Sequence, residues 1–109
     1  MSDPHPLDKL FATAEQRKGG DPTSSYTAKL LGEGVEKCAK KFGEEAVELA
    51  LASVGGDKGA IAAESADVLY HLSVLWAASG ITPDDVYAAL RAREGQSGLA
   101  EKAARKTED

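Results

Sequence analysis

The segment from Lys58 to Ser79 constrains the fold more than any other part of the chain. It contains no proline, it follows Gly55-Gly56-Asp57, and it ends at Gly80, so its flanks are those of a helix. Around such a helix, apolar side chains point in nearly every direction: Ile61, Val68, Leu69, Leu72, Val74, Leu75 and Trp76. A helix that is apolar all round is a buried one, so we expect it to be covered on all sides.

Glycine, proline and capping residues divide the rest of the chain into further helices. We expect a first helix from about Pro6 to Lys18, followed by a loop at residues 19–22. A short helix over 26–31, capped by Ser24 or Ser25 and interrupted by Gly32 and Gly34, precedes a long helix over about 35–54. Thr82 and Pro83 open a last helix that ends near Glu94. Gly43, inside the long helix, suggests a close approach of another segment or a ligand.

The sequence therefore predicts an all-α protein, a helical bundle of four to five helices. A chain of 109 residues supplies one domain, over 1–109, with 1–5 and about 96–109 expected to be flexible. So few helices cannot cover the apolar segment completely, and we therefore expect the bundle to be completed by homodimerisation.

Charge and cysteine content limit the partners and the compartment. The net charge of −5 argues against a nucleic-acid partner. A single cysteine, Cys38, allows no internal disulfide and fits a reducing, cytoplasmic environment. We see neither a signal peptide nor an apolar run long enough to cross a membrane.

Two acidic motifs indicate the chemistry. Glu45-x-x-Glu48 and Glu64-x-x-Asp67 each place two carboxylates on one face of a helix, because residues three apart are neighbours there. Carboxylates this close repel each other unless a cation offsets their charge, and Mg²⁺ prefers such oxygen ligands. The sequence predicts a metal site between the two helices, and a metal of this kind usually acts on phosphates.

Helical periodicity adds neighbours to each motif. Lys41 shares the stripe of Glu45 and Glu48, and His71 lies one turn beyond Asp67. Helices packed about 8–10 Å apart, with Mg–O distances of about 2.1 Å, would let opposed carboxylates share one or two ions. We expect His71 beside the metal ligands rather than among them. The chain lacks the Glu-x-x-His pairs of di-iron bundles. Alternatively, the acids form a solvated face with no metal.

The acidic motifs also carry a family resemblance. Lys41-Phe42-Gly43-Glu44-Glu45-Ala46-Val47-Glu48, followed by Glu64-Ser65-Ala66-Asp67, resembles the all-α nucleotide pyrophosphohydrolases of the MazG-like superfamily. Two further stretches, Ser24 to Leu31 and Arg93 to Lys102, narrow the resemblance to the phosphoribosyl-ATP pyrophosphohydrolase family, and Asp67 to Leu72 resembles its second acidic helix. Val35 departs from the family pattern, because the family often has proline at this position.

The resemblance implies a reaction and a set of site residues. It implies hydrolysis of phosphoribosyl-ATP between its α and β phosphates, the second step of histidine biosynthesis, which yields phosphoribosyl-AMP and pyrophosphate. Mg²⁺ would be required, one or two ions per site, with Mn²⁺ able to substitute. The expected metal ligands are Glu45, Glu48, Glu64 and Asp67. Glu44 or Glu45 would orient or deprotonate the attacking water, and the residues expected to contact phosphate or substrate are Lys41, Lys29, Arg17, Tyr26 and Thr27.

Two other functions fit the residues. One is a house-cleaning pyrophosphatase that removes non-standard nucleoside triphosphates with the same metals and fold. The other is a non-enzymatic helical interaction module whose acids are only solvated. Activity on different nucleotides separates the first from the family reaction, and dependence on Mg²⁺ separates the second.

Overall fold

The computed structural model describes residues 4–95 together with 98 and 105. Within this part the chain forms five helices and no strand: α1 (Pro6–Arg17), α2 (Tyr26–Glu33), α3 (Val35–Gly55), α4 (Lys58–Ser79) and α5 (Pro83–Ala92). The all-α prediction is confirmed. Most of the tail from Gln96, including much of the motif that begins at Arg93, lies outside the described residues. None of the helices described here combines the length and apolarity that a membrane span needs.

Capping residues explain where the helices begin and end. The Ser25 hydroxyl accepts a hydrogen bond from the Ala28 amide at 3.1 Å, and the Asp57 carboxylate accepts one from Gly59 at 3.0 Å. Gly56 ends α3 with a left-handed φ of +81°, which glycine adopts without strain. Of the two glycines expected to interrupt α2, Gly32 does not, because the helix continues through it to Glu33; Gly34, with φ +98°, does separate α2 from α3.

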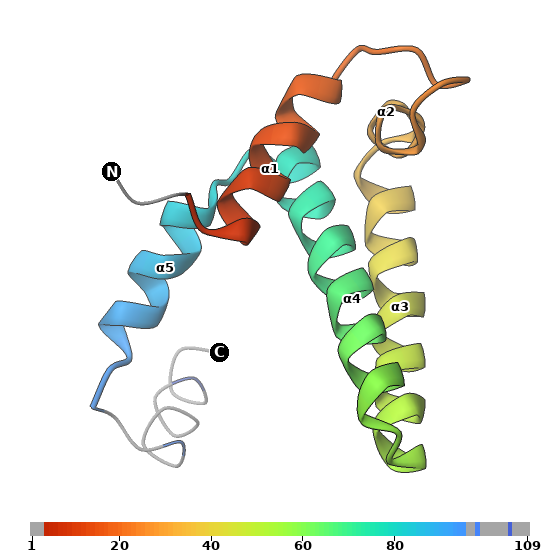
Figure 1. The fold of residues 1–109 in the computed structure, drawn as a ribbon. Coiled ribbons are helices and arrows are strands. Elements are labelled where there is room, and N and C mark those ends of the chain that lie inside the picture. Colours follow the sequence, from red (N-terminus) through yellow and green to blue (C-terminus); the bar gives the residue numbers. More distant parts are fainter. Residues whose placement is uncertain (1–3, 96–97, 99–104, 106–109) are drawn as a thin grey trace.

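The two long helices, α3 and α4, run side by side as a hairpin, and α1 crosses the upper part of α4 (Figure 1). The core lies at this upper end, where α1, α2, the start of α3 and the end of α4 meet. It consists of Ala14, Leu30, Cys38, Val74 and Ala77. The Cys38 thiol donates a hydrogen bond to the Leu30 carbonyl at 3.3 Å, which ties α3 to α2 inside this core.

Only the second half of α4 is buried in the single chain, in line with the expectation that so few helices cannot cover it completely. His71, Ser73, Val74, Trp76 and Ala77 are buried, whereas Leu69 is 44% exposed. The reason lies in the lengths of the helices. α1 and α2 pack around the end of α4, while the half that carries Glu64 extends downward beside α3 (Figure 1).

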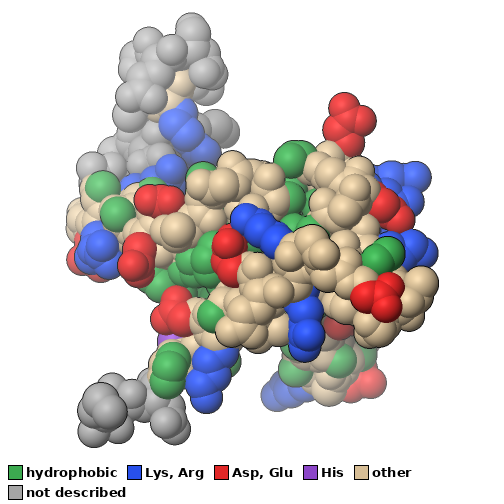
Figure 2. All heavy atoms as spheres, turned by 90° about the horizontal axis from the view of Figure 1, so that it is seen from above, with side chains coloured by type: hydrophobic (Ala, Val, Ile, Leu, Met, Phe, Trp, Pro, Cys, Tyr) green, Lys and Arg blue, Asp and Glu red, His purple; other side chains and the backbone are tan. Residues whose placement is uncertain are grey.

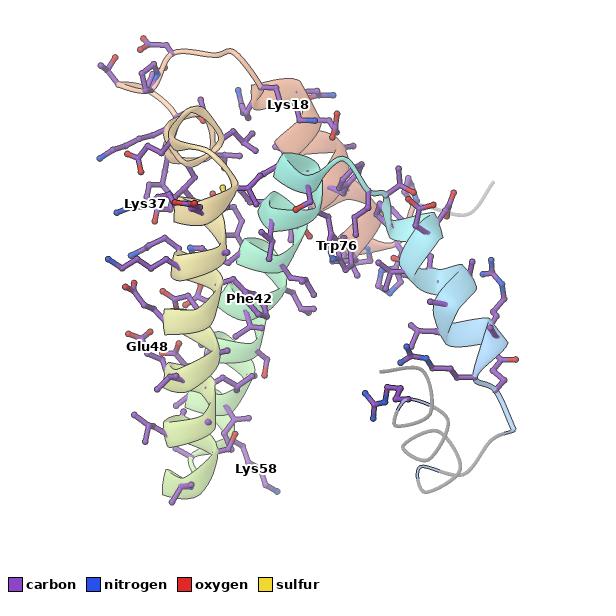
Figure 3. All side chains as sticks on the ribbon, turned by 180° about the vertical axis from the view of Figure 1, so that it is seen from behind. Lys18, Lys37, Phe42, Glu48, Lys58 and Trp76 are labelled. Carbon is purple, nitrogen blue, oxygen red and sulfur yellow. The ribbon has the colours of Figure 1, made fainter. Side chains whose placement is uncertain are left out.

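An apolar stripe on α3 is also left open. Val47, Leu51 and Val54 are 59%, 67% and 88% exposed, and their spacing of four and three residues places them on one side of the helix. At 100° per residue this side is roughly opposite Phe42, which faces α4 (Figure 3). Exposed apolar surface of this kind is typical of an interaction face.

Candidate metal centre

Three carboxylates converge where α3 and α4 pack together. Glu45 and Glu48 come from α3 and Glu64 from α4, and one oxygen of each lies within 4.8 Å of the other two. The spacing of three residues puts the two α3 side chains on one face, and the hairpin places α4 against that face. The structure thus brings together three of the four expected ligands, from both helices.

Two buried polar atoms in this region have no hydrogen-bond partner. They are Oε2 of Glu64 and Nε2 of His71. Leaving a buried acceptor unsatisfied costs about 1–3 kcal/mol, and more for a charged group, so native proteins rarely do so without a reason. A hard divalent cation among the three carboxylates would give the Glu64 oxygen its missing partner, and the donor set therefore fits Mg²⁺.

His71 is oriented by its own helix. Its Nδ1 lies 3.0 Å from the carbonyl oxygen of Asp67, and because a carbonyl can only accept, Nδ1 must carry the proton. In the neutral ring Nε2 then holds a free lone pair. The rings of Tyr70 and Tyr26 stand edge-on to the imidazole, with centroids 4.9 Å and 6.3 Å away. His71 is thus positioned to accept a hydrogen bond or to bind a metal beside the carboxylates.

The pKa of Glu45 reflects how closely the carboxylates are packed. Its pKa is raised above the ordinary value, first by desolvation and then by the hydrogen bond to Glu48 and the repulsion from that carboxylate. The charge of Asp67 raises the pKa of Glu45 further, while His71 lowers it. The ionised cluster is therefore unfavourable in the absence of a cation.

Asp67 does not occupy the place expected from the sequence. It was expected to point into the bundle with Glu64, but it is exposed and lies outside the group of three close oxygens. The helical pattern gave the correct face, but among the described residues no helix covers Asp67. The close approach of another segment expected at Gly43 is not seen either: apart from its own helix, no described atom lies within 4 Å of the position that a Cβ would take.

Basic side chains lie beside the carboxylates. The Lys41 ammonium forms a salt bridge of 3.2 Å with Glu44, which lowers the pKa of Glu44 and raises that of Lys41. Lys41 also lines a cavity of about 180 Å³ together with Tyr26, Lys29, Leu30, Glu33 and Lys37. Of the three lysines that line this cavity, Lys37 is the one that was not expected to contact substrate, although it lies four residues before Lys41 on the same face of α3.

The remaining expected substrate residues are placed differently. The Thr27 hydroxyl is hydrogen-bonded to the Tyr70 hydroxyl, which ties α2 to α4 beside His71. Arg17 is exposed on the last turn of α1 and does not line the cavity that contains Lys29 and Lys41. Its contact with substrate stays a prediction.

The fold and this site define a class of protein: an all-helical protein with a carboxylate cluster suited to a divalent cation, next to a lysine-lined cavity. The family comparison identifies it further. The model of the phosphoribosyl-ATP pyrophosphohydrolase family matches residues 7–94. The chain therefore belongs to this family, and the resemblance seen in the sequence is confirmed.

Relatives match along almost their whole length. The chain is 60% identical over 104 residues to a phosphoribosyl-ATP pyrophosphatase of Parvibaculum lavamentivorans, covering 95% of each chain. It is 61% identical over 99 residues to one of Cereibacter sphaeroides, covering 91% of this chain and 96% of the relative. A third, from Azospirillum brasilense, is 58% identical over 101 residues, covering 93% of this chain and 91% of the relative.

Replacing Glu45 by glutamine should stabilise the metal-free protein. Because the folded-state pKa of Glu45 lies above its ordinary value of 4.5, the ionised carboxylate opposes folding at neutral pH. In thermal unfolding with EDTA, Glu45→Gln should raise Tm at pH 7. This gain should shrink as the pH falls through the raised pKa and disappear below 4.5.

Glu36→Gln provides the matched control for this experiment. It removes the same charge from α3, but in the first turn, away from the cluster. It should give no increase in Tm. Equal increases in both variants would show that net charge, rather than the cluster, is responsible.

Proposed function

We propose that this protein hydrolyses phosphoribosyl-ATP to phosphoribosyl-AMP and pyrophosphate, the second step of histidine biosynthesis, with Mg²⁺ bound by Glu45, Glu48 and Glu64 and assisted by Asp67. The observation that carries the proposal is the convergence of three carboxylates from two helices, one of which, Glu64, has a buried oxygen without a hydrogen-bond partner. Membership of the family supports the reaction and the substrate. A hard divalent cation, Mg²⁺ or Mn²⁺, one or two per site, is the cofactor that this donor set accepts.

Some groups of the site would neutralise phosphate charge, and others would orient the attacking water. When bound, Mg²⁺ neutralises phosphate charge and lowers the pKa of a coordinated water. Lys41 and Lys29 offset the remaining phosphate charge from the side of α2, and Tyr26 lines the same cavity. His71 can accept a hydrogen bond through the lone pair of Nε2, and this would orient a water or hydroxyl group near the carboxylates.

The two candidate bases differ in their surroundings. Glu44 is paired with Lys41, which lowers its pKa and makes it a weaker proton acceptor. The carboxylate of Glu45 makes no salt bridge with a described residue and lies inside the cluster, where the attacking water would be held. Between these two, we assign the water-orienting role to Glu45, and we assign to Glu44 the task of holding the Lys41 ammonium in place.

A cytoplasmic location and a small-molecule nucleotide as the main partner belong to the same proposal. They are supported by the single cysteine, which is buried and unpaired, and by the family reaction. A membrane or a nucleic acid has no role in this reaction.

The direct test measures pyrophosphate release from purified protein given phosphoribosyl-ATP, with Mg²⁺ or with EDTA, and with ATP and dCTP as comparison substrates. We expect release from phosphoribosyl-ATP that depends on Mg²⁺. Glu48→Gln and Glu64→Gln should reduce it by more than the ~10–100-fold that loss of an outer-shell partner typically costs. Glu36→Gln should keep full turnover.

The alternatives predict other results. Release from ATP or dCTP but not from phosphoribosyl-ATP would keep the metal centre and indicate a house-cleaning pyrophosphatase. No release from any nucleotide by the folded protein, and no increase in Tm with Mg²⁺, would indicate a non-enzymatic helical module.

We further propose that the chain forms a homodimer through the open side of α3 and the uncovered half of α4. Val47, Leu51 and Val54 present an apolar stripe that a second copy can cover, and a small domain has much to gain from this extra burial. A second copy related by two-fold symmetry would also cover the side of α4 on which Asp67 is exposed. Asp67 would then be more buried, as expected from the sequence.

Leu51→Glu tests this interface. A charge in the middle of the stripe should dissociate the dimer and make Tm depend less on protein concentration, because folding is then no longer coupled to association. Light scattering after size-exclusion chromatography gives the mass. Thr13→Glu, an exposed change on α1, is the control and should stay dimeric. A wild-type protein that is monomeric at all concentrations would refute the proposal.

A further inference from the structure

The lysine-lined cavity is separate from the carboxylate cluster. It lies between α2 and the first turns of α3, has a volume of about 180 Å³, and receives Tyr26, Lys29, Leu30 and Glu33 from α2 and Lys37 and Lys41 from α3. None of the three clustered glutamates lines it. A ligand group in this cavity would be held by protein side chains rather than by the cation.

The charges in the cavity are unbalanced. Three lysines and one acid, Glu33, line the cavity, and Glu44 lies near Lys41 and Lys37 at its edge, so the described charges still leave a formal excess of one positive charge. Lys41 is paired with Glu44, but Lys29 and Lys37 make no salt bridge with any described residue. A phosphate group carries about −1.5 to −2 charges at neutral pH and accepts several hydrogen bonds, so it matches two free ammonium groups.

The excess charge is local. Seen from above, basic side chains at this end of the molecule are interspersed with acidic ones and do not merge into one broad basic face (Figure 2). A cavity of this size with three lysines therefore suits a single phosphate group better than the extended backbone of a nucleic acid.

The cavity is aligned with the metal centre along α3. Lys37, Lys41, Glu45 and Glu48 recur at spacings of four, four and three, so they share one face, and Lys37 and Glu48 lie along the same side of α3 in Figure 3. With a rise of 1.5 Å per residue, Lys41 is about 6 Å and Lys37 about 12 Å from Glu45 along the helix axis. One extended substrate can therefore reach both places.

We propose that Lys29, Lys37 and Lys41 bind a terminal phosphate of the substrate that the cation does not hold, and that Lys37 is a specificity-determining residue. This inference rests on the proposed function, because phosphoribosyl-ATP carries a phosphate at each end. The distance of Lys37 from the carboxylates favours the 5′-phosphate of the phosphoribosyl group over the end of the triphosphate. This phosphate is absent from ordinary nucleoside triphosphates, so the cavity would select the substrate.

The test compares Lys37→Ala with Lys40→Ala, which removes a lysine from the same helix outside the cavity. We expect Lys37→Ala to raise KM for phosphoribosyl-ATP about tenfold, with kcat within about twofold, because a charge-assisted contact to a distant phosphate is lost. Lys37→Arg should restore most of the KM. Lys40→Ala should change neither constant.

Direct binding identifies the phosphate and does not depend on turnover. Titration calorimetry with ribose 5-phosphate should show binding to the wild type that is weakened about tenfold in Lys37→Ala and unchanged in Lys40→Ala. Weakened binding of Mg²⁺-pyrophosphate instead would place Lys37 at the cation-bound triphosphate and would overturn its role in specificity. Unchanged binding of both probes and unchanged KM in Lys37→Ala would overturn the inference.

These results distinguish the inference from the proposed function. If the wild type hydrolyses phosphoribosyl-ATP and Lys37→Ala behaves like Lys40→Ala, only the phosphate site fails. If the wild type does not hydrolyse phosphoribosyl-ATP but binds ribose 5-phosphate through Lys37, the reaction fails and the phosphate site remains. Lys37 is exposed, so its replacement should leave the fold intact, as circular dichroism would show.

Discussion

Repulsion among carboxylates on two packed helices is the constraint on which the site depends. Glu45, Glu48 and Glu64 are brought together by the α3–α4 hairpin, and desolvation together with their mutual repulsion outweighs the opposing effect of His71, so that the pKa of Glu45 is raised. Such an arrangement persists only if packing elsewhere stabilises the hairpin. The core at the upper end, where Leu30, Cys38 and Val74 are almost completely buried, provides that packing. The residues that stabilise the hairpin and the carboxylates of the site therefore lie in different parts of the same two helices.

The site lies where the buried upper end of the α3–α4 hairpin meets its exposed lower part, and this explains which residues it contains. His71 lies in the buried part, so its ring is oriented by a backbone hydrogen bond and by tyrosine rings. Asp67, one turn earlier, is exposed. Lysines from α2 and α3 flank the carboxylates on the other side, so negative and positive groups follow each other along one face of α3. A polyphosphate bound with a cation needs both kinds of partner.

The sequence predicted the helices well because their limits depend on local chemistry. Ser25, Asp57 and Thr82 cap helices, and Gly34, Gly56 and Gly80 end them, through contacts within a few residues. It also predicted which carboxylates share a face. It could not show which faces are covered, because this depends on how far α1 and α2 reach along α4. For this reason the burial of Asp67 was overestimated, and Lys37 was not distinguished from solvated lysines until α2 was seen to form the other wall of its cavity.

The central claim is that the three carboxylates form a metal centre. It is tested most directly by anomalous diffraction from crystals grown with Mn²⁺, which replaces Mg²⁺ in oxygen-ligand sites and can be located by its own scattering. The account predicts an anomalous peak between Glu45, Glu48 and Glu64, and its loss in Glu64→Gln crystals. Bound Mn²⁺ that lies elsewhere, or a cluster that stays empty at Mn²⁺ concentrations sufficient for turnover, would contradict it.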